Sequence, residues 1–289
     1  MNDAKIAGAA HPAAGFRPPI TIIYIVGNTH SGTTLLNRVL GAHPEVINIG
    51  GTKNLQSFHA GLKKCSCGAA RAEECPFWSR VGAEISERYG RALRDLHLEP
   101  GWSGFAADYV QFAHAVCTVS GARIIVDSSR DVVRLRHIRS VGGIDVIPVH
   151  IFKQPRAQHA SYRRKGQGLG ATIREYWRVN LKAVRHNRPD SPMIVVPYEA
   201  FCRDPARYVA TIMAQAGSCM HRDQLERWGG ADLHVLGGNR MKFAKSSEIR
   251  LDENWQALPL MEAVALDLTC LPLALAMQWK ARGAASAPA

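Results

Sequence analysis

The sequence predicts an α/β fold in which helices cover both faces of a parallel sheet, and three observations lead to it. Short apolar runs rich in β-branched residues are typical of buried strands, and they occupy residues 20–26, 124–126, 145–152 and 193–196. Stretches with helical periodicity lie between the runs, at residues 33–40, 105–119, 132–138, 171–187 and 206–216. A glycine-rich segment joins the first run to the first helical stretch. Because strand and helix alternate, we expect βαβ crossovers with ligands bound at the carboxyl ends of the strands.

The chain length and composition are those of a globular protein. It has 289 residues, of which 46% are hydrophobic, enough for one large domain or two small ones. No linker divides the chain, so we expect a single domain over residues 20–282. Residues 1–19, rich in Ala, Gly and Pro, and residues 283–289, rich in Ala, are expected to be disordered tails.

The formal net charge of +12 indicates an anionic partner. A nucleic acid, a membrane surface or a multiply phosphorylated small molecule would each fit. The basic residues are scattered and form no run of like charges, which is unfavourable for nucleic-acid binding.

Signals for export or membrane insertion are not expected from the sequence. Residues 1–19 lack a basic stretch followed by an apolar core. The apolar stretch at 268–279 is 12 residues long and contains Pro272, short of the roughly 18 residues that a membrane span needs. Seven cysteines, an odd number, favour reduced thiols. We therefore expect a cytoplasmic protein without a transmembrane segment.

The segment after the first predicted strand has the form of a phosphate-binding loop. It reads GNTHSGTT over residues 27–34 and leads into a helix. Successive backbone N–H groups of such a loop can converge on an anion at the helix N-terminus. A kinase or ATPase would have lysine at the position of Thr33. The loop therefore lacks the cation that stabilises the charge of a terminal phosphoryl group. A tight strand-to-helix turn without a ligand is the alternative. The predicted fold is therefore of the P-loop type, and the candidate anion-binding residues are Asn28, Thr29, His30, Ser31, Gly32, Thr33 and Thr34.

A second candidate anion site follows the strand predicted at 145–152. Lys153 stands at the strand end, and Ser161 follows eight residues later on a predicted helix. A cation and a hydroxyl so placed can converge on one phosphate. The alternative is a solvated basic corner at Lys153 and Arg156.

Together these segments resemble the PAPS-dependent sulfotransferase superfamily, particularly its bacterial and carbohydrate-type members (PAPS is 3′-phosphoadenosine 5′-phosphosulfate). In that family a Lys or Arg usually precedes Ser-Gly-Thr-Thr, where this chain has His30. The second segment resembles the family's R-x-P-R/K site with a downstream serine, with Lys153 in place of the first arginine. Weaker matches in the same order are DSSR at 127–130, YEAF at 198–201 with DP at 204–205, and GGNR at 237–240 with Trp255 beyond. The resemblance covers roughly residues 21–255.

The resemblance implies the sulfotransferase fold and the transfer of a sulfuryl group from PAPS to an acceptor hydroxyl, with release of PAP and no required metal. The acceptor could be a carbohydrate, a lipid, a small molecule or a peptide tyrosine. The loop amides and His30 would bind the sulfonate and 5′-phosphate, and Lys153 and Ser161 the 3′-phosphate. Arg130 would be a second cation near the sulfonate. Gly238, Asn239 and Arg240 would close over the nucleotide.

The resemblance leaves the catalytic base open. Related enzymes commonly have a Gly-Glu pair after the second strand, where this chain has Gly50 and Gly51. His59 and Asp127 are the leading substitutes, although His59 could be a surface residue and Asp127 a turn cap. Otherwise the acceptor hydroxyl would be acidic already, or the chain would bind PAP or PAPS with little catalysis. A P-loop small-molecule kinase is the other alternative.

Three cysteines, Cys65, Cys67 and Cys75, resemble an insertion found in some bacterial members. Structural zinc usually has four ligands, and the only further candidates in the sequence are the distant Cys117 and the nearby His59. We therefore expect packed or redox-labile thiols in preference to a metal site, with a disulfide left open.

Overall fold

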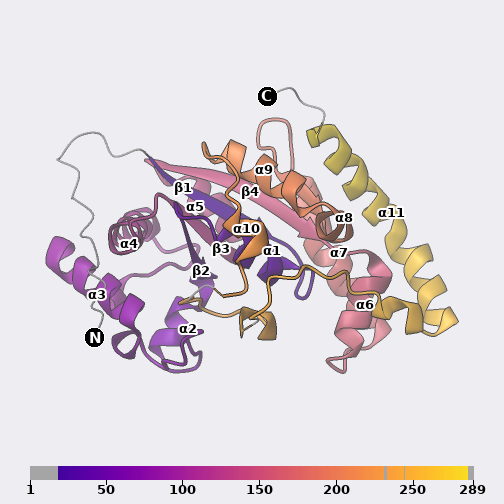
Figure 1. The fold of residues 1–289 in the computed structure, drawn as a ribbon, viewed down its shortest axis with the longest axis horizontal. Coiled ribbons are helices and arrows are strands. Elements are labelled where there is room, and N and C mark those ends of the chain that lie inside the picture. The colour runs from indigo at the N-terminus through magenta and orange to yellow at the C-terminus, as the bar shows by residue number, and fades with distance from the viewer. Residues whose placement is uncertain (1–18, 231–232, 244, 286–289) are drawn as a thin grey trace, which may run out of the picture.

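A computed structural model describes residues 19–230, 233–243 and 245–285, and the side chains of Arg240 and of residues 282–285 lie outside that description. Its centre is a five-stranded parallel sheet with the order β2-β3-β1-β4-β5 (Figure 1). The strands are β1 (Ile20–Val26), β2 (Val46–Gly50), β3 (Ile124–Arg130), β4 (Ile144–Phe152) and β5 (Ile194–Pro197). The helices are α1 (Thr33–Leu40), α2 (Leu55–His59), α3 (Pro76–Tyr89), α4 (Phe105–Ser120), α5 (Val132–Arg139), α6 (Pro155–Arg163), α7 (Leu169–His186), α8 (Tyr198–Arg203), α9 (Pro205–Gln215), α10 (Asp223–Glu226) and α11 (Leu260–Ala285).

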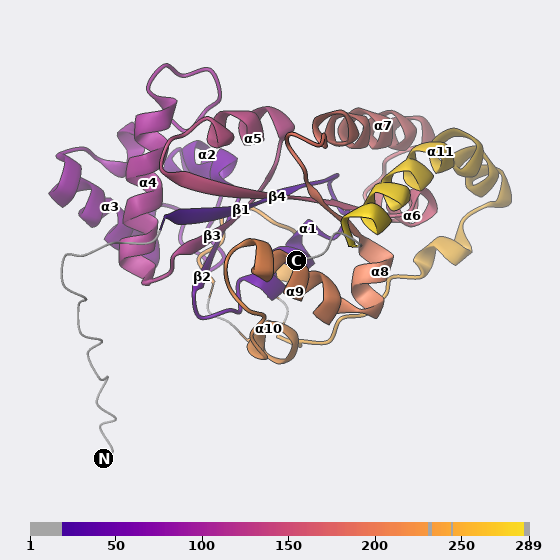
Figure 2. The same ribbon diagram turned by 90° about the horizontal axis from the view of Figure 1, so that it is seen from above.

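Helices cover both faces of the sheet, as the view from above shows (Figure 2). Side chains of β1 alternate between the two faces: Ile22 and Tyr24 pack in the core under α3, α4 and α5, whereas Ile23 and Ile25 pack in the core under α1, α8 and α9. Such two-sided burial explains why β1 reads as a continuous apolar run. The predicted fold class is confirmed.

The predicted elements are present, with differences at the ends. The run at 20–26 and the helix at 33–40 have the expected bounds, while β3 continues to Arg130, four residues past the predicted end. The strand β2 was not among the predicted runs because its sequence, VINIG, contains Asn48 and ends in glycine. Helix α6 was expected only as the helix that carries Ser161 and not from its periodicity, since its buried positions are largely polar or small.

Helix α11 corrects two expectations. It is 26 residues long and runs through Pro272, whereas the sequence suggested an apolar stretch of only 12 residues at 268–279. By length and composition alone, Leu260–Ala281 could cross a membrane, with a mean hydropathy of 1.7 and 33% of its apolar window buried in the fold. The helix also continues to Ala285, into the tail expected at 283–289. The remainder of both expected tails, residues 1–18 and 286–289, lies outside the described residues.

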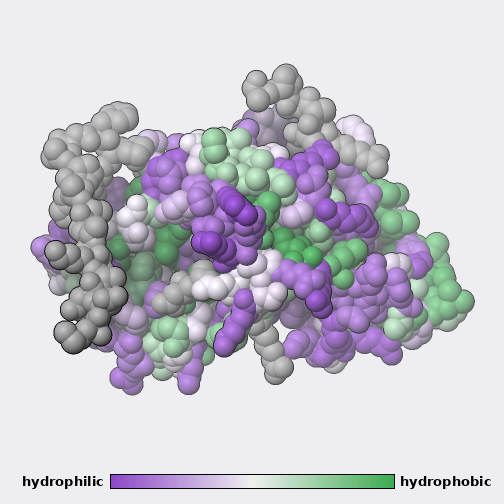
Figure 3. Space-filling view, viewed as in Figure 1, coloured by the Kyte–Doolittle hydropathy of each residue, from purple (hydrophilic) through white to green (hydrophobic). Residues whose placement is uncertain are grey.

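The two sides of α11 differ. Leu266, Cys270 and Met277 are buried in a third core with Phe152 of β4 and Tyr176 of α7. On the other side, five large apolar side chains are more than half exposed, and Figure 3 shows apolar surface at the edge of the molecule where α11 lies. These are Leu260, Met261, Leu268, Leu275 and Trp279. The helix is thus a part of the fold that leaves an apolar stripe on the surface.

The carboxyl ends of the strands meet at one edge of the sheet. The central strand β1 lies between β3 and β4, and the chain leaves β1 toward the β2 edge and leaves β3 toward the opposite, β5 edge. Ligands of open parallel sheets bind where the strand order reverses in this way. A ligand site is therefore expected among the residues that follow β1, β3 and β4.

Candidate active site

The loop at 27–34 passes from β1 into α1 against the ends of neighbouring elements. A Cβ on Gly27 would lie 2.4 Å from the carbonyl oxygen of Ile151 on β4. Gly32 has φ of 98°, and a Cβ there would lie 2.3 Å from Cδ2 of Tyr198. Gly32 is also the N-cap of α1, with no side-chain cap, so the first amides of this helix are available to an anion. Only glycine fits at either position.

Polar contacts from two helices fix the loop. Ser31 Oγ donates to the carbonyl oxygen of Asn28 at 2.8 Å, and Gln158 Nε2 of α6 donates to that of Thr29 at 2.6 Å. Asn28 Nδ2 donates to the carbonyl oxygen of Glu175 on α7 at 3.4 Å. Its Oδ1 is buried and has no hydrogen-bond partner among the described residues. The loop is therefore rigidly placed and keeps a polar atom unsatisfied.

His30 and Arg130 share an uncommon backbone conformation. Their φ values of 64° and 68° are the positive ones among the described non-glycine residues. This conformation is strained for residues with a side chain and is concentrated at functional sites. Arg130 Nη1 donates to Thr29 Oγ1 at 3.1 Å, so the end of β3 and the loop after β1 are in contact.

The surroundings of His30 are cationic. Burial lowers the pKa of its imidazole, and Lys165, Arg130 and Lys153 lower it further. The ring of Tyr162 on α6 meets it edge-on, with centroids 6.0 Å apart. In the free protein the imidazole is therefore neutral at neutral pH, and an anionic ligand would favour its protonated form.

Lys153 lies directly after β4 and is only 5% exposed. Its Nζ donates to Ser161 Oγ at 3.4 Å, and it lies over the ring of Tyr198, 4.3 Å from the centroid. Burial lowers the pKa of Lys153, while Asp252 and Glu199 oppose the change. The structure thus brings together the two residues that the sequence assigned to one phosphate.

An acidic residue that the sequence did not suggest lies beside this second site. The Oδ2 of Asp252 lies 3.8 Å from Lys153 Nζ and 2.7 Å from Arg164 Nη2. Burial would raise the pKa of Asp252, but the hydrogen bond from Arg164 and the charges of Lys153 and Arg164 hold it at about 2. A carboxylate therefore sits between cations where an anionic ligand would bind. No sequence motif identifies Asp252, because it lies in a loop about 100 residues downstream of Lys153.

Glu199 supports the same turn. Its Oε1 accepts a hydrogen bond from the backbone N–H of Gln154 at 2.9 Å, and burial raises its pKa. This contact holds the start of α6 against α8.

The late loop lies beside the first one. A Cβ on Gly238 would be 3.7 Å from Cγ2 of Thr34, and Asn239 Oδ1 accepts from the N–H of Met241 at 2.9 Å. The structure therefore places Gly238 next to the start of α1. The side chain of Arg240 lies outside the described residues.

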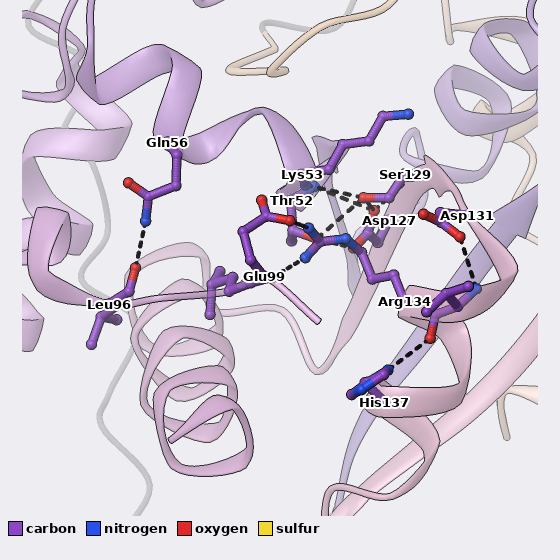
Figure 4. A network of polar contacts seen from close by, with 12 residues as sticks. Thr52, Lys53, Gln56, Leu96, Glu99, Asp127, Ser129, Asp131, Arg134 and His137 are labelled. Atoms are coloured by element: carbon purple, nitrogen blue, oxygen red, sulfur yellow. Dashed lines mark hydrogen bonds and ion pairs between the residues drawn. The ribbon is translucent and has the colours of Figure 1, made fainter. Parts of the chain in front are cut away.

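Asp127 is an anchor of the fold, which corrects its assignment as a base. It is fully buried and accepts hydrogen bonds from Thr52 Oγ1 at 2.6 Å, Ser129 Oγ at 2.6 Å and Ser129 N at 2.8 Å (Figure 4). Its oxygens are thus occupied, and no acceptor can reach them. The network ties the end of β3 to the 3₁₀ turn after β2.

His59 does not reach the loop, which corrects its assignment too. It lies at the end of α2, where its ring contacts Phe58 with centroids 6.2 Å apart. Burial lowers its pKa, and the charges that act on it are those of Glu73 and Arg94. The charges that act on His30 come from the end of β3 and from the residues directly after β4 and α6. His59 therefore belongs to a different part of the molecule.

A cavity of about 240 Å³ opens beside the loop, lined by residues from four elements. Its polar and charged lining residues are Thr29, Lys53, Arg130, Asp131, Glu175, Arg178 and Lys182. Of its two carboxylates, Asp131 caps α5 by accepting from Val133 N at 2.8 Å. Glu175 pairs with Arg178 at 2.7 and 2.8 Å. Sequence reasoning missed Lys53 and Glu175 because they lie outside every motif and reach the cavity only through the fold.

A second cavity, of about 680 Å³, begins at the residue after Lys153. Gln154 lines it together with Arg203, Arg207 and Trp255. It shares no lining residue with the smaller cavity. Cationic and aromatic groups therefore border the turn that carries Lys153.

Comparison with known proteins gives a likeness of fold. No family model and no curated protein matches the sequence. Among solved structures, the sulfotransferase domain of the Synechococcus PCC 7002 olefin synthase is 18% identical, over 88% of this chain and 95% of that one, with a TM-score of 0.52. The sulfotransferase domain from the curacin biosynthetic pathway is 14% identical over 88% of this chain and 98% of that one (TM-score 0.48). Sulfotransferase STF1 of Mycobacterium tuberculosis H37Rv is 16% identical over 72% of this chain and 70% of that one (TM-score 0.42). The first likeness shows that the chain has the sulfotransferase fold.

Proposed function

We propose that this protein is a PAPS-dependent sulfotransferase, which transfers a sulfuryl group to an acceptor hydroxyl and releases PAP. The observation that carries the proposal is a pair of distinct anion sites at the carboxyl edge of the sheet. One is the lysine-less loop that leads into α1, and the other is Lys153 with Ser161. A donor with phosphates at both its 5′ and 3′ positions needs two such sites, whereas ATP needs one.

The 5′ end of the donor would lie on the loop. The amides at the start of α1 would receive the 5′-phosphate, and His30 and Arg130 would face the sulfonate oxygens. Because cations surround His30, the incoming charge would raise the pKa of its imidazole and make it a better donor. A sulfuryl group carries less charge than a terminal phosphoryl group, so a loop without lysine can serve it.

The 3′-phosphate would lie at Lys153 and Ser161. Arg164, now paired with Asp252, would be a second cation for it. The larger cavity next to Gln154 offers room for the adenosine, with Trp255 as an aromatic surface.

The acceptor would enter the smaller cavity. Its hydroxyl oxygen attacks sulfur in line, the bond from sulfur to the 5′-phosphate oxygen breaks, and PAP leaves with the electron pair. The hydroxyl proton needs an acceptor, and Glu175 is the lining carboxylate not used as a helix cap. Its oxygens pair with Arg178, but unlike those of the fully buried Asp127 they are open to the cavity, with the side chain 32% exposed. Lys53 is a cation here: burial and Arg130 lower its pKa, but a bound anion would raise it. We therefore assign the base to Glu175.

Nucleotide selectivity tests the donor assignment. PAP without Mg²⁺ should raise the melting temperature of the protein more than ADP does, because ADP lacks the 3′-phosphate. ATP with Mg²⁺ should do no better than ADP. Equal shifts for PAP and ADP would contradict the proposal, and a larger shift for ATP with Mg²⁺ would favour the kinase alternative.

Substitution of Glu175 tests the base. Glu175→Gln keeps the shape of the side chain and removes the proton acceptor, so turnover should fall by about 10²-fold or more with PAP affinity unchanged. Asp131→Asn is the matched control on the other lining carboxylate, and it should keep both turnover and stability, because Asn caps a helix about as well as Asp. Full turnover by Glu175→Gln would exclude Glu175 as the base.

A further inference from the structure

Three cysteines and one histidine meet outside the proposed active site. Sγ of Cys65, Cys67 and Cys75 and a ring nitrogen of His234 lie within 4.8 Å of one another. His234 is 159 residues after Cys75 in the sequence, which is why the sequence offered only Cys117 and His59 as a fourth ligand. The fold supplies the residue whose absence argued against a metal.

The spacings match a tetrahedron around one ion. Zinc holds sulfur at about 2.3 Å and imidazole nitrogen at about 2.0 Å, so tetrahedral ligands lie about 3.8 Å apart for two sulfurs and about 3.5 Å for sulfur and nitrogen. Here Cys67 and Cys75 Sγ are 3.6 Å apart, and Cys75 and Cys65 Sγ are 3.8 Å apart. Nδ1 of His234 lies 3.2 Å from Cys75 Sγ and 4.0 Å from Cys65 Sγ.

A disulfide fits these distances poorly. Its two sulfurs would be about 2.05 Å apart, and the three cysteines are free thiols. The set of three sulfurs and one nitrogen is typical of zinc among the divalent metals. An iron–sulfur cluster has several irons between its cysteines and would need more room than 4.8 Å.

The surroundings orient the ligands as metal sites require. Cys75 is the N-cap residue of α3, so one ligand is held at the start of a helix. The ring of Phe77 stacks on the ring of His234 with centroids 5.6 Å apart. Trp78 Nε1 donates to the carbonyl oxygen of His234 at 3.0 Å. Outer contacts of this kind fix the orientation of the imidazole ring.

We propose that Cys65, Cys67, Cys75 and His234 bind one structural zinc ion. The thiols release their protons to solvent on binding. All four positions of the ion are filled by protein, so no place remains for a reactive water, and the ion has no part in sulfuryl transfer.

The ion would join two distant segments of the chain. Around the cluster, Ser66 N donates to the carbonyl oxygen of Val235 at 3.2 Å, and Leu236 N donates to that of Ile49 on β2 at 3.0 Å. Gly238, the residue beside Thr34, follows two residues after Leu236. Zinc would therefore hold the late loop, which contains Gly238, against β2 and α1. The zinc site itself is independent of the proposed function, and only its effect on nucleotide binding rests on that function.

Metal content tests the site without any assay of activity. The full-length protein, purified in reducing buffer without added metal, should contain one zinc per chain. A strong chelator applied with a thiol-reactive mercurial should release it, and the melting temperature should fall by roughly 10 °C or more. Cobalt in place of zinc should give the visible bands of a tetrahedral thiolate site.

Matched variants separate the cluster from the other candidates. Cys67→Ser changes the exposed member of the cluster and should lower zinc content by at least about fivefold, as should His234→Ala. Cys219→Ser, an exposed cysteine elsewhere, and His59→Ala should keep one zinc per chain. If a variant does not fold, the zinc and cobalt measurements on the wild-type protein decide alone.

Two results would overturn the site. One is wild-type protein with less than about a tenth of a zinc per chain and a melting temperature that added zinc does not raise. The other is a disulfide between Cys67 and Cys75 in protein purified under reducing conditions. Failure of the nucleotide tests above would leave the metal content unchanged, so the two proposals fail separately.

Discussion

Lys153 is the residue whose removal should separate the two anion sites most clearly. The change Lys153→Met keeps roughly the length of the side chain and removes the ammonium group, which lies over the ring of Tyr198. Because Lys153 Nζ lies 3.4 Å from Ser161 Oγ, a phosphate bound to both would lie about 4 Å from the ammonium. At that distance a unit charge pair is worth about 4 kcal/mol near a protein surface.

Part of that energy is already used in the free protein. Asp252 Oδ2 is 3.8 Å from Lys153 Nζ, so the phosphate replaces an existing attraction. The net gain should therefore be that of a charged hydrogen bond, about 2 kcal/mol, or about 30-fold in Kd. ADP has no 3′-phosphate, and its affinity should stay within about twofold of wild type.

Titration calorimetry of PAP and of ADP, without Mg²⁺, measures both quantities. Lys64→Met is the control for loss of an exposed lysine away from the site, and it should change neither affinity. Ser161→Ala should weaken PAP in the same direction and by less, since it removes a neutral partner. Equal losses for PAP and ADP in Lys153→Met, or no loss for PAP, would refute the placement of the 3′-phosphate.

Three further outcomes follow from the structure. His30→Ala should lower turnover by about 10²-fold with little change in PAP affinity, and His30→Lys should retain more activity than His30→Ala. Because burial and nearby cations lower the pKa of His30, PAPS binding should take up a proton and weaken as pH rises. A flat pH profile together with active variants would exclude this role. Asp127→Asn disrupts buried hydrogen bonds from Thr52 and Ser129 and should lower the free energy of unfolding by about 2–3 kcal/mol, which is a fall of roughly 4–12 °C in melting temperature. Lost turnover in a variant of normal stability would restore Asp127 as a base. Asp252→Asn removes a carboxylate that competes for Lys153 and should tighten PAP by about fivefold, whereas weaker PAP would show that Asp252 organises the cations.

The sequence predicted the features that depend on local pattern. Buried parallel strands read as apolar runs, and the loop at 27–34 needs glycine at Gly27 and Gly32 for reasons of backbone geometry. The placement of Lys153 near Ser161 follows from a strand end and the two helical turns after it. Each of these features is set within a dozen neighbouring residues.

The features that could not be predicted from the sequence depend on contacts between distant segments. Asp252 reaches Lys153 from a loop about a hundred residues downstream, and His234 reaches Cys75 across 159 residues. Glu175 is exposed to the small cavity only because α7 packs beside the loop. Asp127 was misjudged because a carboxylate near a site can serve as an anchor, and only its hydrogen bonds decide between the two roles.

Transfer of radiolabelled sulfate from PAPS tests the central assignment most directly. The protein would be incubated without Mg²⁺ with labelled PAPS and a panel of hydroxyl acceptors that includes sugars, a lipid alcohol, phenols and a tyrosine peptide. We expect label in at least one acceptor, with an equal amount of PAP released, and loss of both in Glu175→Gln. PAPS that binds but transfers no label to any acceptor, while ATP with Mg²⁺ phosphorylates one of them, would contradict the assignment.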